Sequence, residues 1–362
     1  MKTNSHNRAE YLLSLLVSVL LAFLVGGIIM IATGHNPLEG YAALFTGAFG
    51  NQRAIGNTLY KSFQLCMTGL ATAVASQGGI FNVGGEGQMY LGALASCWLG
   101  AVLTGQSPWL VLPLCMLAAI AAGALYALIP ALLKIKMHIS EVITTILMNS
   151  IAIYFCTYMA NGPLKTSERG VSQGTAALDK VFQFSKIIKG SNLTESVFYI
   201  AAITLLVWYL MSSTTTGFRM KLTGQNERFA IFSGMRASTL GILGMLISGA
   251  MCGMLGMFEC FGLQTRFKPD FSSEFYFDGM LVAMIMRYRP LGTILMSFFF
   301  GILKIGSITM QSKTGISSEL ILIVQSIIIF FMAAEEGILN NLRKRRAARM
   351  TTGVITKGGD EA

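Results

Sequence analysis

Long apolar runs alternate with short polar segments along almost the whole chain. Such runs occupy Tyr11–Ala32, Ser62–Ser76, Met89–Leu103, Trp109–Leu133, Ile139–Ala160, Ser196–Met211, Ser238–Cys260, Leu291–Met310 and Leu320–Ala334. Most are long enough to cross the hydrocarbon core of a bilayer as α-helices, whose backbone groups are satisfied internally. The pattern predicts an all-α polytopic membrane protein of about ten transmembrane helices, some of them broken or short. Gly279–Met286 is too short to span unaided, so it either contributes a short crossing or forms half of a re-entrant pair.

The composition agrees with a membrane protein. Of 362 residues, 53% are hydrophobic and 12% charged, and the mean hydropathy is +0.61. A soluble domain carries about 25% charged residues. The net charge of +10 does not indicate a nucleic-acid partner, because the basic residues lie mainly between apolar runs and in the tail.

Basic segments between spans are expected on the cytoplasmic side, and so are both termini here. We predict a transmembrane domain over residues 1–338, which includes a cytoplasmic loop at 214–237, and a basic cytoplasmic tail over 339–362. The longest polar insertion, Asn161–Glu195, then lies outside. Phe261–Asp278 is also expected outside, with its aromatic residues forming an interfacial belt. Lys304 could snorkel outward along its stem, and a functional role is the alternative.

The sequence lacks the motifs that usually carry catalysis or bind metal. The six cysteines lie in or at the edges of apolar runs without a C-x-x-C pair, and the three histidines are scattered. The chain also lacks a P-loop, a G-x-S-x-G elbow and an H-E-x-x-H motif. We therefore predict no catalytic site, metal or cofactor, and we expect any ATP to be bound by another chain.

A polar, glycine-dense break, Gly78–Gln88, separates the second and third apolar runs. Irregular backbone at membrane depth persists only where it is buried in protein or lines a wet cavity. The carboxylate of Glu86 and the amides of Asn82 and Gln88, set among Gly84 and Gly85, favour a solute pathway. The alternative is an ordinary turn at the cytoplasmic surface with Glu86 solvated.

Two further polar groups lie in the run that starts near Ile139. Ser140 is a plausible N-cap, and Glu141 suits the positive end of a helix dipole. Asn149 falls roughly 15 Å further along, near the middle of the bilayer. It could bind a neighbouring helix or face a pathway, and the sequence favours neither.

The loop at 214–237 contains a short helical pattern. After Gly224 and Gln225, Asn226 can cap a helix that begins near Glu227, and Gly234 can end it. Arg228 follows, and the helix would leave Phe229, Ile231 and Phe232 partly exposed. Such a helix could dock in a groove of a partner or lie on the membrane as an amphipathic connector.

These motifs together resemble a known family. Gly79–Gln88 followed by Leu91-Gly92-Ala93 looks like the "FNIGAEGQ…GA" signature of ABC-importer permeases for nucleosides and related simple sugars. Ser140–Asn149 is similar to the family's "NEVISTxMLN" segment, Gly224–Gly234 to its coupling loop, and Phe277–Gly292 to its "FDGIAVALLGxNxPLG" segment. Ser140, Glu227 and Arg287-Tyr288 depart from the family pattern, which leaves the substrate open.

The resemblance implies a type II importer architecture. It implies a permease that pairs with a second permease subunit, in a heterodimer, and works with a cytoplasmic ATPase and an extracytoplasmic substrate-binding lipoprotein in a bacterial membrane. The pathway would include Asn82, Gly84, Gly85, Glu86, Gln88, Glu141 and Asn149, and the coupling loop would use Gly224–Phe229 and Gly234. An importer of another sugar-like solute and an ATP-independent secondary transporter remain alternatives, the latter with Glu86 or Glu141 binding a coupling ion.

Overall fold

The computed structural model describes residues 20–21, 23–167, 173–272, 275–317, 322–323, 326–327 and 330. The chain divides into two compact units, one formed by residues 1–47 and 306–362 and the other by residues 48–305. The larger unit holds all of the predicted site residues.

The larger unit is built from helices. In order they are α3 (Gln52–Gln77), α4 (Gly85–Val102), α5 (Pro108–Met137), α6 (Glu141–Asn161), η1 (Lys180–Phe182), α7 (Ser196–Ser213), α8 (Thr215–Gln225), α9 (Glu227–Phe232), α10 (Ala237–Glu259), a π-helical turn η2 (Cys260–Gln264), α11 (Phe275–Ile285) and α12 (Pro290–Thr314), whose last turns belong to the smaller unit. No β-strand occurs among the described residues, apart from one isolated bridge between Lys186 and Thr194. The predicted all-α class is confirmed.

Five described helices are long and apolar enough to cross a membrane: α5, α6, α7, α10 continued by η2, and α12. Two shorter apolar helices, Phe23–Ala32 and α11, accompany them. This confirms a polytopic membrane protein. Leu320–Ala334 and the start of Tyr11–Ala32 lie mainly outside the described residues, so the number of crossings remains a prediction.

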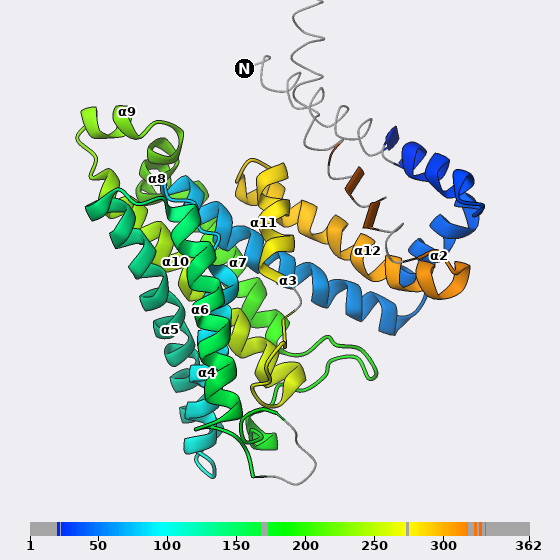
Figure 1. The fold of residues 1–362 in the computed structure, drawn as a ribbon, viewed down its shortest axis with the longest axis horizontal. Helices are drawn as coiled ribbons and strands as arrows, with labels where there is room; N and C mark the ends of the chain where they lie inside the picture. The colour runs from blue at the N-terminus through cyan, green and yellow to red at the C-terminus, as the bar shows by residue number, and fades with distance from the viewer. Residues whose placement is uncertain are drawn as a thin grey trace, which may run out of the picture. The chain divides into compact units, whose positions relative to one another are not determined.

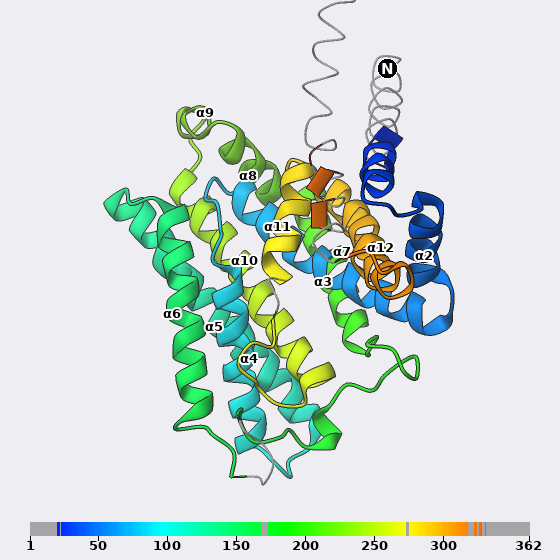
Figure 2. The same cartoon turned by 45° about the vertical axis from the view of Figure 1, so that its right-hand side comes forward.

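Helix α10 forms the centre of the larger unit and packs against α3, α4 and α5 (Figures 1 and 2). The helices approach closely because glycines face each other. A Cβ atom at Gly253 would lie 2.2 Å from the carbonyl oxygen of Ala119, and one at Gly123 would lie 2.1 Å from that of Gly249. Small residues at such crossings allow backbone contact, the usual basis of helix association in membranes.

The helix ends follow the predicted signals only in part. Lys134 and Lys136 close α5, and His138 takes the left-handed conformation that ends it. Helix α6 begins directly after Ser140, as predicted, but the Ser140 side chain makes no capping hydrogen bond. Glu141 instead forms an ion pair with Lys134 at 2.8 Å, which joins the end of α5 to the start of α6.

The interpretation of the aromatic segment as an interfacial belt is wrong. Phe261, Phe267, Phe271 and Tyr276 are all buried in the main hydrophobic core. Tyr90 of α4 packs against this cluster, with its ring 4.7 Å from that of Phe271. The segment after η2 therefore folds back into the protein.

In the smaller unit, α2 (Pro37–Phe49) contributes its residues up to Gly47. The Tyr41 hydroxyl donates a hydrogen bond to the carbonyl of Phe23, and the two rings meet edge to face. Gly306 of α12 contacts Leu44 closely, since a Cβ atom there would lie 2.5 Å from the Leu44 carbonyl oxygen.

Candidate translocation and coupling sites

The glycine-dense break is real and buried. Helix α3 ends at Gln77, α4 begins at Gly85, and the residues between them are irregular. Asn82 is 0% exposed and Glu86 only 5%. The alternative of a surface turn with a solvated Glu86 is therefore wrong.

The side chain of Asn82 organises the break. Its Oδ1 accepts hydrogen bonds from the backbone N–H of Gly84 at 2.9 Å and from Nε2 of Gln88 at 3.1 Å. Its Nδ2 donates to Oε1 of Gln88 and to Oγ of Ser248 on α10, both at 2.9 Å. One amide thus fastens the break both to the start of α4 and to the central helix.

Asn149 of α6 holds the other side of the break. It accepts a hydrogen bond from the backbone N–H of Gly87 and donates one to the carbonyl of Val83, each at 2.8 Å. Thr145, one turn earlier, accepts from the backbone N–H of Val83 at 3.3 Å. Of the two roles left open for Asn149, it plainly performs the helix-joining one.

Glu86 joins the break to α11. Its carboxylate accepts a short hydrogen bond from the Ser272 hydroxyl and another, at 3.1 Å, from the backbone N–H of Tyr276. That N–H lies in the first turn of α11, where a carboxylate satisfies an otherwise unpaired donor and the helix dipole. A second bond joins the same two segments, because the Tyr276 hydroxyl donates to the carbonyl of Asn82 at 2.6 Å.

The predicted pathway residues therefore come together, with one exception. Asn82, Gly84, Gly85, Glu86, Gln88 and Asn149 form one buried network, whereas Glu141 lies apart at the start of α6 in its ion pair with Lys134. The network binds the break to four helices, α4, α6, α10 and α11. Its role in a solute pathway remains a prediction.

A second polar cluster was not predicted. The ammonium group of Lys304 on α12 lies 2.8 Å from the carboxylate of Asp278 on α11, and that of Lys61 on α3 lies 3.8 Å from it. The expectation that Lys304 snorkels outward is wrong, because it pairs with this carboxylate.

Glu259 of α10 adds a further carboxylate to the same region. It accepts short hydrogen bonds from the Tyr60 hydroxyl and the Gln64 amide, which flank Lys61 on α3. Lys61 also lies over the ring of Phe275, with 4.3 Å between the nitrogen and the ring centroid. A signal was present in the sequence: Lys61 borders an apolar run and Glu259 lies inside one, and charges there usually mark function.

The predicted coupling helix is present as α9. The Asn226 side chain accepts a hydrogen bond from the backbone N–H of Phe229 at 3.0 Å, and Gly234 follows the helix with a φ of 78°. Phe229 and Ile231 are each 55% exposed and Phe232 is 90% exposed. The helix lies at the end of the larger unit opposite the loop that follows α6 (Figures 1 and 2).

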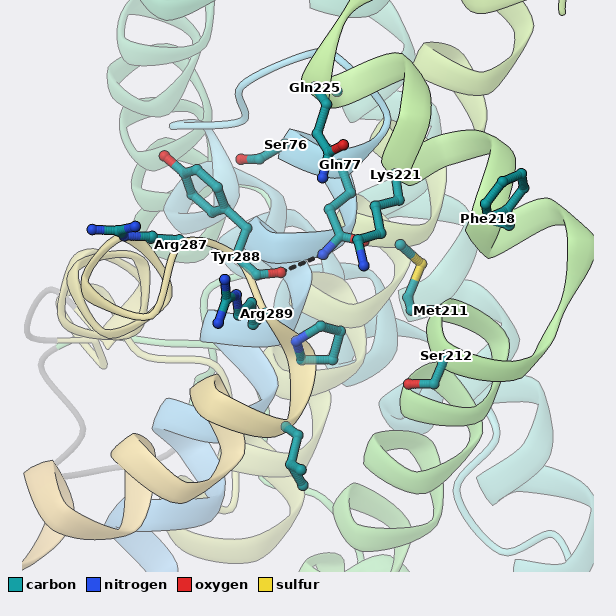
Figure 3. A pocket seen from close by; sticks show the side chains of 13 residues that line it. Ser76, Gln77, Met211, Ser212, Phe218, Lys221, Gln225, Arg287, Tyr288 and Arg289 are labelled. Atoms are coloured by element: carbon teal, nitrogen blue, oxygen red, sulfur yellow. Dashed lines mark hydrogen bonds between the residues drawn. The ribbon is translucent and has the colours of Figure 1, made fainter. Parts of the chain in front are cut away.

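A pocket of about 710 Å³ adjoins the start of this segment. Its lining comes from the ends of α3, α7 and α8 and from the turn before α12, and includes Gln77, Lys221, Gly224, Arg287 and Arg289. Gln77 donates a short hydrogen bond to the carbonyl of Tyr288. Figure 3 shows Lys221 and Arg289 on opposite sides of Gln77, with Arg287 extending away. Because Gln77 is the last residue before the break, this bond joins the α11–α12 turn to the start of the break.

Comparison with known proteins identifies the family. Residues 54–333 match the permease component of branched-chain amino acid transport systems. The guanosine ABC transporter permease protein NupP of Bacillus subtilis is 32% identical over 88% of this chain and 92% of its own length. The nucleoside ABC transporter permease protein NupB of Lactococcus lactis is 31% identical over 98% of this chain and 99% of its own length.

A more distant relative is named for a different substrate. The glucose ABC transporter permease protein TsgB13 of Haloferax volcanii is 28% identical over 86% of this chain and 84% of its own length. The two bacteria above each have a second permease that is also similar to this chain, named NupQ and NupC. No solved structure matches the chain. With a family match over most of its length and full-length relatives that are ABC permeases, this chain belongs to the family of ABC permease components typified by branched-chain amino acid transport systems.

Proposed function

We propose that this chain is a permease subunit of an ABC importer that carries nucleosides across the cytoplasmic membrane of a bacterium, with both termini in the cytoplasm. The observation that carries the proposal is the full-length similarity to two permeases named for guanosine and nucleosides.

The proposed importer contains three other kinds of subunit. A second permease completes the membrane domain, in keeping with the two permease relatives found in each of two bacteria. A cytoplasmic ATPase hydrolyses ATP, since this chain carries no P-loop. A substrate-binding lipoprotein on the outer side delivers the solute. These subunits follow from the resemblance to nucleoside importers.

The exposed face of α9 is the proposed docking site for the ATPase. A short helix with three exposed apolar side chains, Phe229, Ile231 and Phe232, suits a groove on a partner. The positive-inside bias supports a cytoplasmic location, because Arg219, Lys221, Arg228 and Arg236 surround it with Glu227 as the one acid.

Movement of α9 has a route to the break. Gly224, just before α9, lies so close to Gln77 that a Cβ atom on it would be 2.7 Å from the Gln77 carbonyl oxygen. Gln77 is the last residue of α3, next to the break. In the proposed cycle, closure of the ATPase dimer displaces α8 and α9, this contact shifts the end of α3, and the pathway opens to the other side.

The proposal is tested by reconstitution. The complete importer, with both permeases, ATPase and binding protein, is placed in proteoliposomes and supplied with ATP and radiolabelled guanosine, glucose or riboflavin. We expect ATP-dependent uptake of guanosine and little uptake of the other two. Uptake of glucose without guanosine would favour the sugar-like alternative, which the Haloferax relative represents. Uptake of guanosine without the ATPase would instead indicate a secondary transporter.

A further inference from the structure

The charged cluster on α3, α11 and α12 adjoins a candidate membrane span, because Lys304 belongs to α12. Gln77 at the end of α3 bonds to Tyr288 just before α12, so these two helix ends lie at the same level. Lys61 is roughly 24 Å from that level along α3, and Lys304 roughly 21 Å along α12. The hydrocarbon core is about 30 Å thick. Lys304 is the fifteenth of the 25 residues of α12, a helix long and apolar enough to cross a membrane, so the cluster lies beside the middle of a candidate span.

The cluster is only partly covered by this chain. The side chains of Lys61, Asp278 and Lys304 are 13%, 18% and 30% exposed. A charged group at this depth is costly against lipid, and such groups face a bundle interior or a water-filled cavity. The face formed here by α3, α11 and α12 is thus directed toward water or protein.

The cluster holds groups of both kinds. Lys61 and Lys304 supply ammonium groups, and Asp278 supplies the carboxylate between them. The carboxylates of Glu259 and Glu86 are also close enough to Lys61 to attract it. A set of ammonium donors and carboxylate acceptors offers hydrogen bonds of both kinds. Ammonium groups donate three hydrogen bonds each, and carboxylates accept at two oxygens.

From these observations we infer that the Lys61–Asp278–Lys304 cluster lines the solute pathway and hydrogen-bonds the hydroxyl groups of a neutral solute as it passes. The second permease closes the other side of this pathway. The inference rests on the proposed function and adds to it the face and the residues that meet the solute. Asp278 is the specificity-determining acceptor, and the two lysines position its carboxylate.

The test measures discrimination between guanosine and an analogue that lacks both ribose hydroxyls. Wild-type importer and Asp278→Asn importer are compared in proteoliposomes with the same binding protein and ATPase. Because the binding protein is unchanged, its own selectivity cancels in the comparison. We expect Asp278→Asn to reduce guanosine uptake about tenfold while analogue uptake changes little, since a site built to bond a hydroxyl rejects the molecule that lacks it.

Matched variants separate this role from a structural one. Lys313→Met on α12 and Asp270→Asn in the segment before α11 alter the same residue types at exposed positions. Both should leave the ratio of guanosine uptake to analogue uptake unchanged. If Asp278→Asn does not assemble, the double variant Asp278→Asn with Lys304→Met removes both members of the ion pair and serves in its place.

Each result decides the matter. A loss of discrimination in an assembled variant supports the inference. Unchanged discrimination overturns it and leaves the proposed function intact. Failure of both variants to assemble also overturns it, because the cluster is then structural. A wild-type importer that takes up no nucleoside refutes the proposed function, and the inference fails with it.

Discussion

Gly85 is the residue at which a side chain is least tolerable in the break. A Cβ atom there would lie 2.0 Å from Cε2 of Tyr276, a ring that is fully buried and bonded through its hydroxyl to Asn82 and Thr72. The ring has no space to retreat into. The requirement for glycine at Gly85 is thus steric, imposed by a residue 191 positions later in the chain.

We predict that Gly85→Ala destabilises the purified importer by about 1–3 kcal/mol through overpacking. Gly84→Ala is the matched control, since its Cβ would meet its nearest atom, Cβ of Thr145, at 3.1 Å. Thermal unfolding of both variants in detergent measures the effect. Equal melting temperatures for the two would show that Tyr276 moves aside easily.

Glu86 and Glu141 are both acidic residues in membrane helices, yet they differ in surroundings. Glu86 accepts from a hydroxyl and from a backbone N–H in the first turn of α11, whereas Glu141 pairs with a single lysine whose side chain is 39% exposed. An amide in place of Glu86 has one acceptor oxygen and brings a donor toward a donor. The two positions should therefore respond differently to the same substitution.

We predict that Glu86→Gln lowers stability by about 1–3 kcal/mol, the cost of leaving a buried polar group unsatisfied. Glu141→Gln should cost less than about 1 kcal/mol, as expected for a partly solvated ion pair. Melting temperatures and guanosine uptake of the two variants are compared side by side. A more severe loss in Glu141→Gln would contradict the assignment of Glu86 as the bond between the break and α11.

At the scale of elements, α9 could be predicted from the sequence alone because its signals are local. Asn226, Glu227 and Gly234 fall within nine consecutive residues, and each acts on backbone beside it. The break at Gly78–Gly84 was likewise visible as a change in composition. What the sequence could not supply was the environment of the break, because its partners Asn149, Ser248 and Tyr276 come from three distant helices.

The location of the aromatic segment was predicted wrongly for a related reason. In a membrane protein the core and the lipid-facing surface are both apolar, so the composition of Phe261–Phe277 does not say which one it joins. The cluster of Lys61, Asp278 and Lys304 was missed because its members are separated by more than 200 residues along the chain, apart from the pair on α11 and α12. Single charges in or beside apolar runs were visible, but their pairing was not.

The docking role of α9 yields a third prediction. Phe232→Asp should abolish co-purification of the ATPase with the permeases while membrane insertion persists, because a charge replaces the most exposed apolar side chain of the helix. Val181→Asp is the matched control, as Val181 is 67% exposed in the loop that follows α6, away from α9. Pull-down of a tagged permease measures the effect. Retention of the ATPase by Phe232→Asp would exclude this face from docking.

At the scale of the whole molecule, partly exposed charges beside an apolar helix predict that a partner subunit covers them. Lys304, Asp278 and Lys61 stay partly exposed beside α12, a helix long and apolar enough to cross a membrane, and charge exposed to lipid is costly. A second subunit removes that cost. Two permeases similar to this chain occur in each of two bacteria.

We predict a heterodimer of permeases. Mass measurement of the purified complex should give one copy of this chain and one of a second permease. As a control for non-specific pairing, this chain expressed without its partner should be recovered in lower yield and melt at a lower temperature. A stable complex that contains two copies of this chain would require a homodimer instead.

The close packing of α10 has a mechanical consequence. With its π-helical turn, α10 continues for 28 residues, a length of about 42 Å, and starts a few residues after α9. Backbone contacts at Gly123, Gly249 and Gly253 leave no side chain between it and α5 at their crossing, so the two helices are expected to tilt together there. A tilt of about 5° at the ATPase end then moves the far end by roughly 4 Å. The stroke of the proposed ATPase would thus also travel along α10 to its far end, beside the route through Gly224 and Gln77.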